Sequence, residues 1–118
     1  MKPANRALRR TAMFLILLAT PGRFDASAAE NPVQFAVRLI DHHFEPAEIH
    51  VPAGKPCILM VTNADDATEE FDSSALRVEK VIAGGHYATI RVPSLAAGRY
   101  PFMGEFHPQT AQGVVVAQ

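Results

Sequence analysis

Apolar and polar residues alternate along most of the chain after residue 32, which is the pattern of β-strands with one buried face. Segments 33–39 and 48–51 show the alternation clearly, whereas 57–62 is almost continuously apolar, as expected for a strand buried on both faces. The seven predicted strands are 33–39, 48–51, 57–62, 77–82, 86–92, 99–103 and 113–117.

Short segments rich in Gly, Pro, Asn and Asp separate these strands and favour turns. Short strands at regular spacing predict an all-β protein with a Greek-key β-sandwich of about seven strands. Segment 69–76 is harder to assign, because Phe71 and Leu76 fit a strand while Ser73 and Ser74 favour a bend or a helical turn. No window after residue 28 has a helical period.

Residues 1–28 have the three parts of an export signal: a basic start, an apolar run at 12–19 and an Ala-Ser-Ala cleavage site at 26–28. The apolar run is shorter than the roughly 20 residues that span a bilayer. We therefore predict a signal peptide at 1–28, a single domain at 29–118 and a periplasmic location. An uncleaved membrane anchor is the alternative interpretation.

Charge and cysteine content limit the classes of function that are open to this protein. The first 28 residues carry five of the eleven Lys and Arg but one of the twelve Asp and Glu, so residues 29–118 have a net charge of −5 with neutral histidines. An acidic domain is a poor partner for nucleic acid and suits a protein that handles cations. Cys57, the single cysteine, leaves no internal disulfide, and its apolar segment predicts a buried strand position.

Several short pieces, in this order and spacing, resemble the cupredoxin-like superfamily over nearly all of residues 29–118. The pieces are 44–54, 61–63, 70–71, 97–102, His107 and Gly113. Within that group the chain looks most like EfeO-type cupredoxin domains, and closest to the small periplasmic cupredoxin of FtrABCD-type ferrous-iron uptake systems. The pieces that carry this finer resemblance are 69–73, 77–80, 104–107 and 110–113.

The resemblance implies a protein that binds iron or copper and helps oxidise ferrous iron before its uptake. It also implies a partner, either an inner-membrane iron permease or a periplasmic iron-binding protein. The chain departs from blue-copper members at three of their four ligands. Gly104 stands in the Cys place, Ala111 or Gln112 in the Met place, and Glu69 in the place of the first His, so that His107 alone remains. A type-1 copper site cannot form without its thiolate.

The main remaining candidate ligands are carboxylates and one histidine in two loops, 63–72 and 104–112, which the predicted fold brings to one end of the sandwich. Such ligands suit iron, manganese, zinc or Cu(II) and disfavour Cu(I). The main candidates are Glu69, Glu70, Glu105 and His107, and the weaker candidates are Asp72, Glu79 and His42.

The candidates differ in how well local structure supports them. Glu105 and His107 flank Phe106 and project to the same side if the segment is extended. Asp72 could instead cap a helical turn, and Glu79 fits a surface position on a strand. His42 precedes His43 in a turn, where solvated histidines are the alternative.

We therefore predict an exported metal-binding protein that acts as an accessory in iron, or copper-assisted iron, uptake. At most it is a component of a ferrous oxidase. One alternative is a metal-free β-sandwich that binds a partner protein, and another is a copper-binding electron-transfer protein. The identity of the metal, and whether a homodimer completes the site, stay open at this point.

Overall fold

The computed structural model describes residues 16, 18–22 and 31–118. The predicted signal peptide at 1–28 therefore lies largely outside the described residues, and its cleavage site at 26–28 lies wholly outside them. Among the residues described, no helix is long and apolar enough to cross a membrane.

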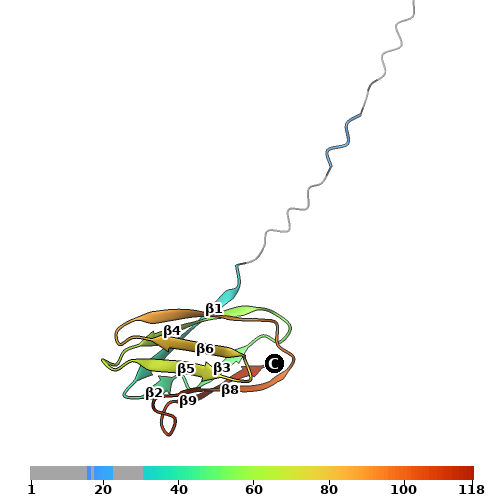
Figure 1. The fold of residues 1–118 in the computed structure, drawn as a ribbon. Coiled ribbons are helices and arrows are strands. Elements are labelled where there is room, and N and C mark those ends of the chain that lie inside the picture. The colour runs from blue at the N-terminus through green and yellow to red at the C-terminus, as the bar shows by residue number, and fades with distance from the viewer. Residues whose placement is uncertain (1–15, 17, 23–30) are drawn as a thin grey trace, which may run out of the picture.

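Nine β-strands make up the fold of the described residues, and they form two sheets packed face to face (Figure 1). The strands are β1 (Val33–Ile40), β2 (His43–Glu45), β3 (Glu48–Val51), β4 (Cys57–Asn63), β5 (Glu69–Ser73), β6 (Val78–Ile82), β7 (Tyr87–Val92), β8 (Gly98–Gly104) and β9 (Gln112–Ala117). The predicted all-β sandwich is confirmed. The two additional strands are β2, in a segment predicted as a turn, and β5, in the segment that was hard to assign.

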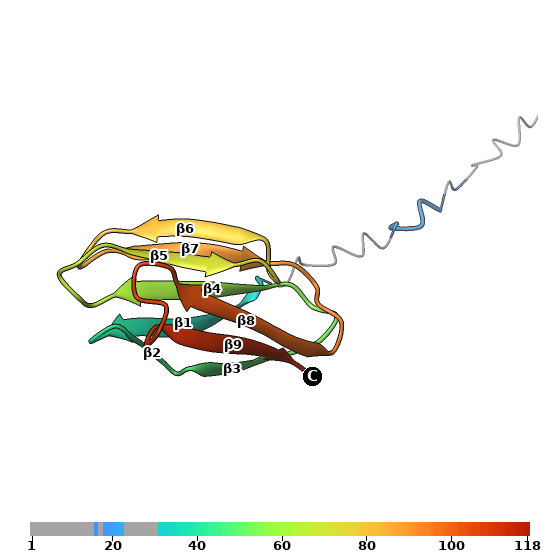
Figure 2. The same ribbon diagram turned by 60° about the horizontal axis from the view of Figure 1, so that its bottom comes forward.

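Both sheets are mixed, and their strand orders are β2-β1-β4-β7 and β3-β9-β8-β5-β6. β1 pairs antiparallel with β2 but parallel with β4, and β3 pairs parallel with β9. Since parallel neighbours cannot be joined by a tight hairpin, the chain crosses between the sheets several times. The views in Figures 1 and 2 show the two layers that result.

The core lies between the sheets and follows the alternation seen in the sequence. Leu59 and Val61 of β4 are buried from one layer, and Phe71 of β5 and Phe102 of β8 are buried from the other. The rings of Phe71 and Phe102 stack with centroids 4.8 Å apart. Cys57 is 2 % exposed, which confirms its predicted buried position, and burial raises the pKa of its thiol.

The bend predicted near Ser73 and Ser74 occurs directly after β5. The backbone amide of Leu76 donates to the Ser73 hydroxyl at 3.0 Å, and that hydroxyl donates to the Pro101 carbonyl at 2.7 Å. Ser73, rather than Asp72, therefore closes this turn. Asp72 is left on the outer surface of the sheet, half-buried.

Four connections meet at one end of the sandwich: the β1–β2 turn, the β4–β5 loop, the β6–β7 turn and the β8–β9 loop (Figure 2). The amide of Asp41 donates to Asp65, the amide of Gly85 donates to the Asp65 carbonyl, and the amide of Phe106 donates to Glu69. These bonds tie the four connections together. The prediction that loops 63–72 and 104–112 lie at the same end is confirmed.

Candidate metal centre

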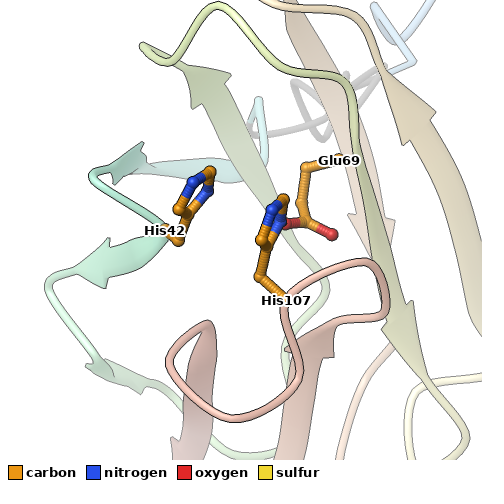
Figure 3. A group of neighbouring side chains, drawn as sticks. All are labelled: His42, Glu69 and His107. Carbon is orange, nitrogen blue, oxygen red and sulfur yellow. The ribbon is translucent and has the colours of Figure 1, made fainter.

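Three side chains from separate elements converge at this end of the sandwich. Glu69 begins β5, His107 lies in the β8–β9 loop, and His42 lies in the β1–β2 turn (Figure 3). One ligand atom from each lies within 4.8 Å of the others. The closest contact is 2.5 Å, between His107 Nδ1 and Glu69 Oε2. Two main candidates and one weaker candidate are thus brought together.

Glu69 is the buried member of the cluster, with 2 % of the residue exposed. It alternates with Phe71 and Ser73 on the inner face of β5, which is why its side chain points inward. Its Oε1 accepts the amide hydrogens of Phe106 at 2.8 Å and Glu70 at 3.1 Å, while its Oε2 contacts His107. All its contacts are therefore made within the protein, as burial of a carboxylate requires.

Gly104 makes room for the Glu69 carboxyl group. A Cβ atom at position 104 would lie 2.7 Å from Glu69 Cδ and 2.7 Å from Ala111 Cβ, closer than carbon atoms pack. The buried carboxylate thus occupies the space that a side chain at 104 would need. A side chain at 104 and the glutamate at 69 therefore compete for the same space.

The β8–β9 loop presents His107 through tight turns. The His107 amide donates to the Gly104 carbonyl at 3.1 Å, and the Ala111 amide donates to the His107 carbonyl at 2.9 Å. The premise that 105–107 is extended is therefore wrong. As a result, Glu105 and His107 do not act as a same-side pair: Glu105 is exposed, whereas His107 contacts the buried Glu69.

His42 reaches the site because of an uncommon turn. Asp41 and His42 have φ angles of 50° and 58°, in the left-handed region, and they link paired residues Ile40 and His43. The His42 ring stacks on His107, with centroids 3.6 Å apart and planes 14° from parallel. Since the nitrogen lone pairs of stacked rings lie in parallel planes, shared coordination of one ion requires one of the two rings to tilt toward the other.

No strong signal in the sequence points to His42, because two-residue hairpins of this kind favour Asn-Gly rather than Asp-His. The alternative that the histidines of this turn are solvated fits His43, which is exposed on β2, better than it fits His42.

The two histidines of the site stay accessible, since the His107 and His42 side chains are 31 % and 41 % exposed. They line an open hollow of about 420 Å³ with Phe106 and residues 108–110.

The other carboxylate candidates gather on the outer face of the five-stranded sheet. Glu70 alternates with Glu69 and so projects to the opposite side of β5, where Asp72 pairs in register with Glu79 of β6. The Glu105 amide donates to the Glu70 carbonyl at 2.9 Å, which places Glu105 beside this group. Sequence proximity suggested one acidic site, and the structure divides the acids between two faces.

Mutual repulsion in this outer group predicts a pH-dependent stability. Loss of hydration, and then repulsion from Glu105, Glu79 and Asp72, raises the pKa of the Glu70 carboxyl group above its usual value. A raised folded-state pKa destabilises the fold above that pKa, and the penalty fades as the pH falls and Glu70 is protonated. Glu70→Gln is thus expected to raise the urea midpoint at pH 7 but not at pH 4. Glu48→Gln, outside the group, serves as control; an equal gain at both pH values would contradict the assignment.

Asp65 is a further charged residue at this end of the fold, and it is not among the ligands predicted from the sequence. Partial burial acts to raise the pKa of its carboxyl group, but hydrogen bonds from the amides of His42 and Asp41 outweigh that effect and hold the pKa below its usual value. The two bonds measure 3.0 Å and 2.7 Å. Asp65 therefore contacts the cluster through His42, and its Oδ2 lies 3.4 Å from His42 Nδ1.

A type-1 copper ion does not fit these residues. The position of the thiolate is Gly104, whose space the Glu69 carboxyl group fills, and Ala111 is fully buried and has no ligand atom. Gln112 is turned away, since its side-chain amide donates to the Pro108 carbonyl at 2.9 Å. The donors present are one carboxylate and two imidazoles, a set for harder divalent ions.

Comparisons with known proteins agree with this architecture. A family model described as a cupredoxin-like domain matches residues 10–117. An uncharacterized protein of Rickettsia prowazekii (strain Madrid E), RP394, is 34 % identical over 87 residues, which are 74 % of this chain and 70 % of that protein.

Solved structures at lower identity share the fold. The Cu(I)-bound metal-binding domain of the Streptococcus pneumoniae D39 exporter CopA superposes with a TM-score of 0.66 at 17 % identity, over 75 % of this chain and 89 % of that one. Auracyanin A, a blue copper protein of Chloroflexus aurantiacus, gives 0.63 at 15 % identity, over 75 % of this chain and all (100 %) of that one. The family match and the sandwich together show that the chain belongs to the cupredoxin-like domain family.

Proposed function

We propose that this protein binds a divalent transition-metal ion through Glu69 and His107, with His42 as the third protein ligand. The observation that carries the proposal is the convergence of their ligand atoms within 4.8 Å from three separate elements. One carboxylate and two imidazoles suit Fe(II), Mn(II), Zn(II) or Cu(II). Glu70 and Glu105, on the outer face, are not ligands of this ion.

Binding requires a small local rearrangement. Ligand atoms about 2.0–2.2 Å from a metal lie about 3.0–3.4 Å from each other, whereas His107 Nδ1 and Glu69 Oε2 are 2.5 Å apart. The ion would therefore have to separate these two atoms to take its place between them. His107 is partly exposed and lies in a loop, so it is the member that can move while Glu69 stays fixed by its two amide donors.

The proposed role of this binding is an accessory function in periplasmic iron, or copper-assisted iron, uptake. Its support is the resemblance to EfeO-type domains at 69–73 and 104–107 and the hard donors at the site. Carboxylate oxygen favours Fe(III) over Fe(II), so binding here would ease oxidation of Fe(II) by a separate one-electron acceptor. An inner-membrane iron permease or a periplasmic iron-binding protein would then receive the ion.

Copper is the second candidate, because two structurally similar proteins, the CopA metal-binding domain with Cu(I) and the blue copper protein auracyanin A, contain it. Cu(II) suits imidazole and carboxylate ligands, whereas Cu(I) prefers the sulfur ligands that this cluster lacks. A metal-free interaction domain is the alternative from another class. It would leave the buried Glu69 beside His107 without a functional reason.

An anaerobic titration tests the proposal. The protein is expected to bind one equivalent of Fe(II) or Cu(II), and the Cu(II) complex to lack an intense visible band, since no thiolate reaches the metal. His107→Ala should weaken binding by more than about 100-fold, beyond the range for residues that only support a ligand. His50→Ala, on the exposed face of β3, is the matched control. No binding of Fe(II), Cu(II) or Mn(II), or equal binding by His107→Ala, would refute the proposal.

A further inference from the structure

We infer that Asp65 is a positioning residue that holds His42 at the metal centre. The inference rests on the proposed function, since it concerns how one of the three ligands is delivered. Asp65 lies in the β4–β5 loop, 23 residues from His42 along the chain, and nothing in the sequence pattern links the two. The link is made by the hydrogen bonds of the β1–β2 turn.

The Asp65 carboxylate accepts both amide hydrogens at the tip of that turn. The amide of Asp41 donates to Oδ1 at 2.7 Å, and the amide of His42 donates to Oδ2 at 3.0 Å. Bonds from amides to a carboxylate are stronger than those between neutral groups. One side chain thus fixes two successive backbone units in a single orientation.

That orientation is one the turn residues resist by themselves. Asp41 and His42 have φ angles of 50° and 58°, in the left-handed region that is uncommon for residues with a Cβ atom. Such a conformation persists when the surroundings over-determine it. Here the carboxylate of Asp65 offsets the cost, and the outcome is that the His42 side chain leaves the turn toward His107 rather than toward solvent.

Asp65 is itself held in place from two sides. Its amide donates to the Asn63 side-chain oxygen at 3.1 Å, and its carbonyl accepts the amide of Gly85 at 3.1 Å. Asn63 is fully buried, and its side-chain amide donates to the Ala67 and Ile82 carbonyls. Support therefore runs from the buried Asn63 through Asp65 to His42, and it resembles the outer hydrogen bonds that orient metal ligands in proteins.

The contact with the imidazole adds a second effect. Asp65 Oδ2 lies 3.4 Å from His42 Nδ1, so Nδ1 is the ring nitrogen that faces the carboxylate. A carboxylate near one ring nitrogen favours the hydrogen on that nitrogen, which leaves the other nitrogen free to bind a metal. Asp65 thereby sets both where His42 lies and which nitrogen it offers.

The test compares Asp65→Ala with Asp66→Ala, the exposed acid next to it in the same loop. Cu(II) affinity and the nitrogen couplings in the electron paramagnetic resonance spectrum are measured for each. Asp65→Ala is expected to weaken Cu(II) binding about 10–100-fold and to remove one of two imidazole couplings, and His42→Ala is expected to remove the same coupling. Asp66→Ala should retain both couplings. Asp65→Asn, which keeps the shape and one acceptor, should give an intermediate loss and serves if the alanine variant fails to fold.

A double variant separates positioning from a general effect. In the His42→Ala background, Asp65→Ala should cost no further Cu(II) affinity, because the ligand it supports is already gone. A further loss there, or equal losses from Asp65→Ala and Asp66→Ala, would overturn the inference while leaving metal binding by Glu69 and His107 intact. Absence of Cu(II) binding by the unaltered protein would instead refute the proposed function.

Discussion

Gly104→Ala should lower the stability of the protein by about 1–3 kcal/mol and weaken its metal binding. The new Cβ would lie 2.7 Å from both Glu69 Cδ and Ala111 Cβ, and overpacking of a filled interior costs about that much. The Glu69 side chain must shift to relieve the contact, so its bonds to the Phe106 amide and to His107 are strained or lost. Urea unfolding and Cu(II) titration of the same sample measure the two effects.

Relief of the contact by other substitutions provides the control. Ala111→Gly removes one of the two clashing atoms, and Glu69→Ala removes the other, so each should recover part of the stability in the Gly104→Ala background. Positions 104 and 69 should therefore be coupled in a double-mutant cycle. Strict additivity of the two substitutions, or a Gly104→Ala variant as stable as the parent, would show that the carboxylate does not occupy that space.

Two substitutions of Glu69 are expected to separate folding from metal binding. Glu69→Ala leaves the Phe106 amide without its acceptor and His107 without its partner, and since this bond is part-buried the cost should not exceed about 1–3 kcal/mol. Glu69→Gln keeps the shape and an oxygen for that amide, so its cost in stability should stay below about 1.5 kcal/mol. Both variants lose the anionic ligand and should bind Fe(II) or Cu(II) more than about 100-fold less tightly.

Glu70→Gln, one residue along β5 but on the outer face, is the matched control and should bind metal as the parent does. Thermal unfolding and anaerobic titration give the two quantities for all three variants. A Glu69→Gln variant with the parent's affinity would mean that the carboxylate is structural. Equal loss in Glu70→Gln would mean that the charge of the whole end of the sandwich, rather than one ligand, attracts the ion.

The fold was predictable because its signal is repeated along the chain. Inward residues such as Leu59, Val61 and Val115 alternate with polar ones, and each strand repeats that information. The two strands that were missed lack it: β2 has three residues, and β5 alternates buried with half-buried acidic positions. Local composition cannot show that such segments are paired, since pairing is decided by their neighbours.

The candidate site was predictable only in part, because ligands are chosen by direction as well as by chemical type. Glu69 and Glu70 are equal in the sequence, yet strand alternation sends one inward and the other outward. His107 was found through its place in the resemblance, whereas His42 depends on positive φ angles, which are uncommon for any residue other than glycine. Asp65 acts through bonds to another loop, and sequence alone does not display such contacts.

The close fit at Gly104 also limits which ligands positions 69 and 104 can hold together. Because the Glu69 carboxyl group needs the space beside position 104, a cysteine side chain there would overlap it. A thiolate at 104 and a carboxylate at 69 are therefore alternatives in this chain, and Gly104→Cys should be accommodated only when Glu69 is shortened at the same time.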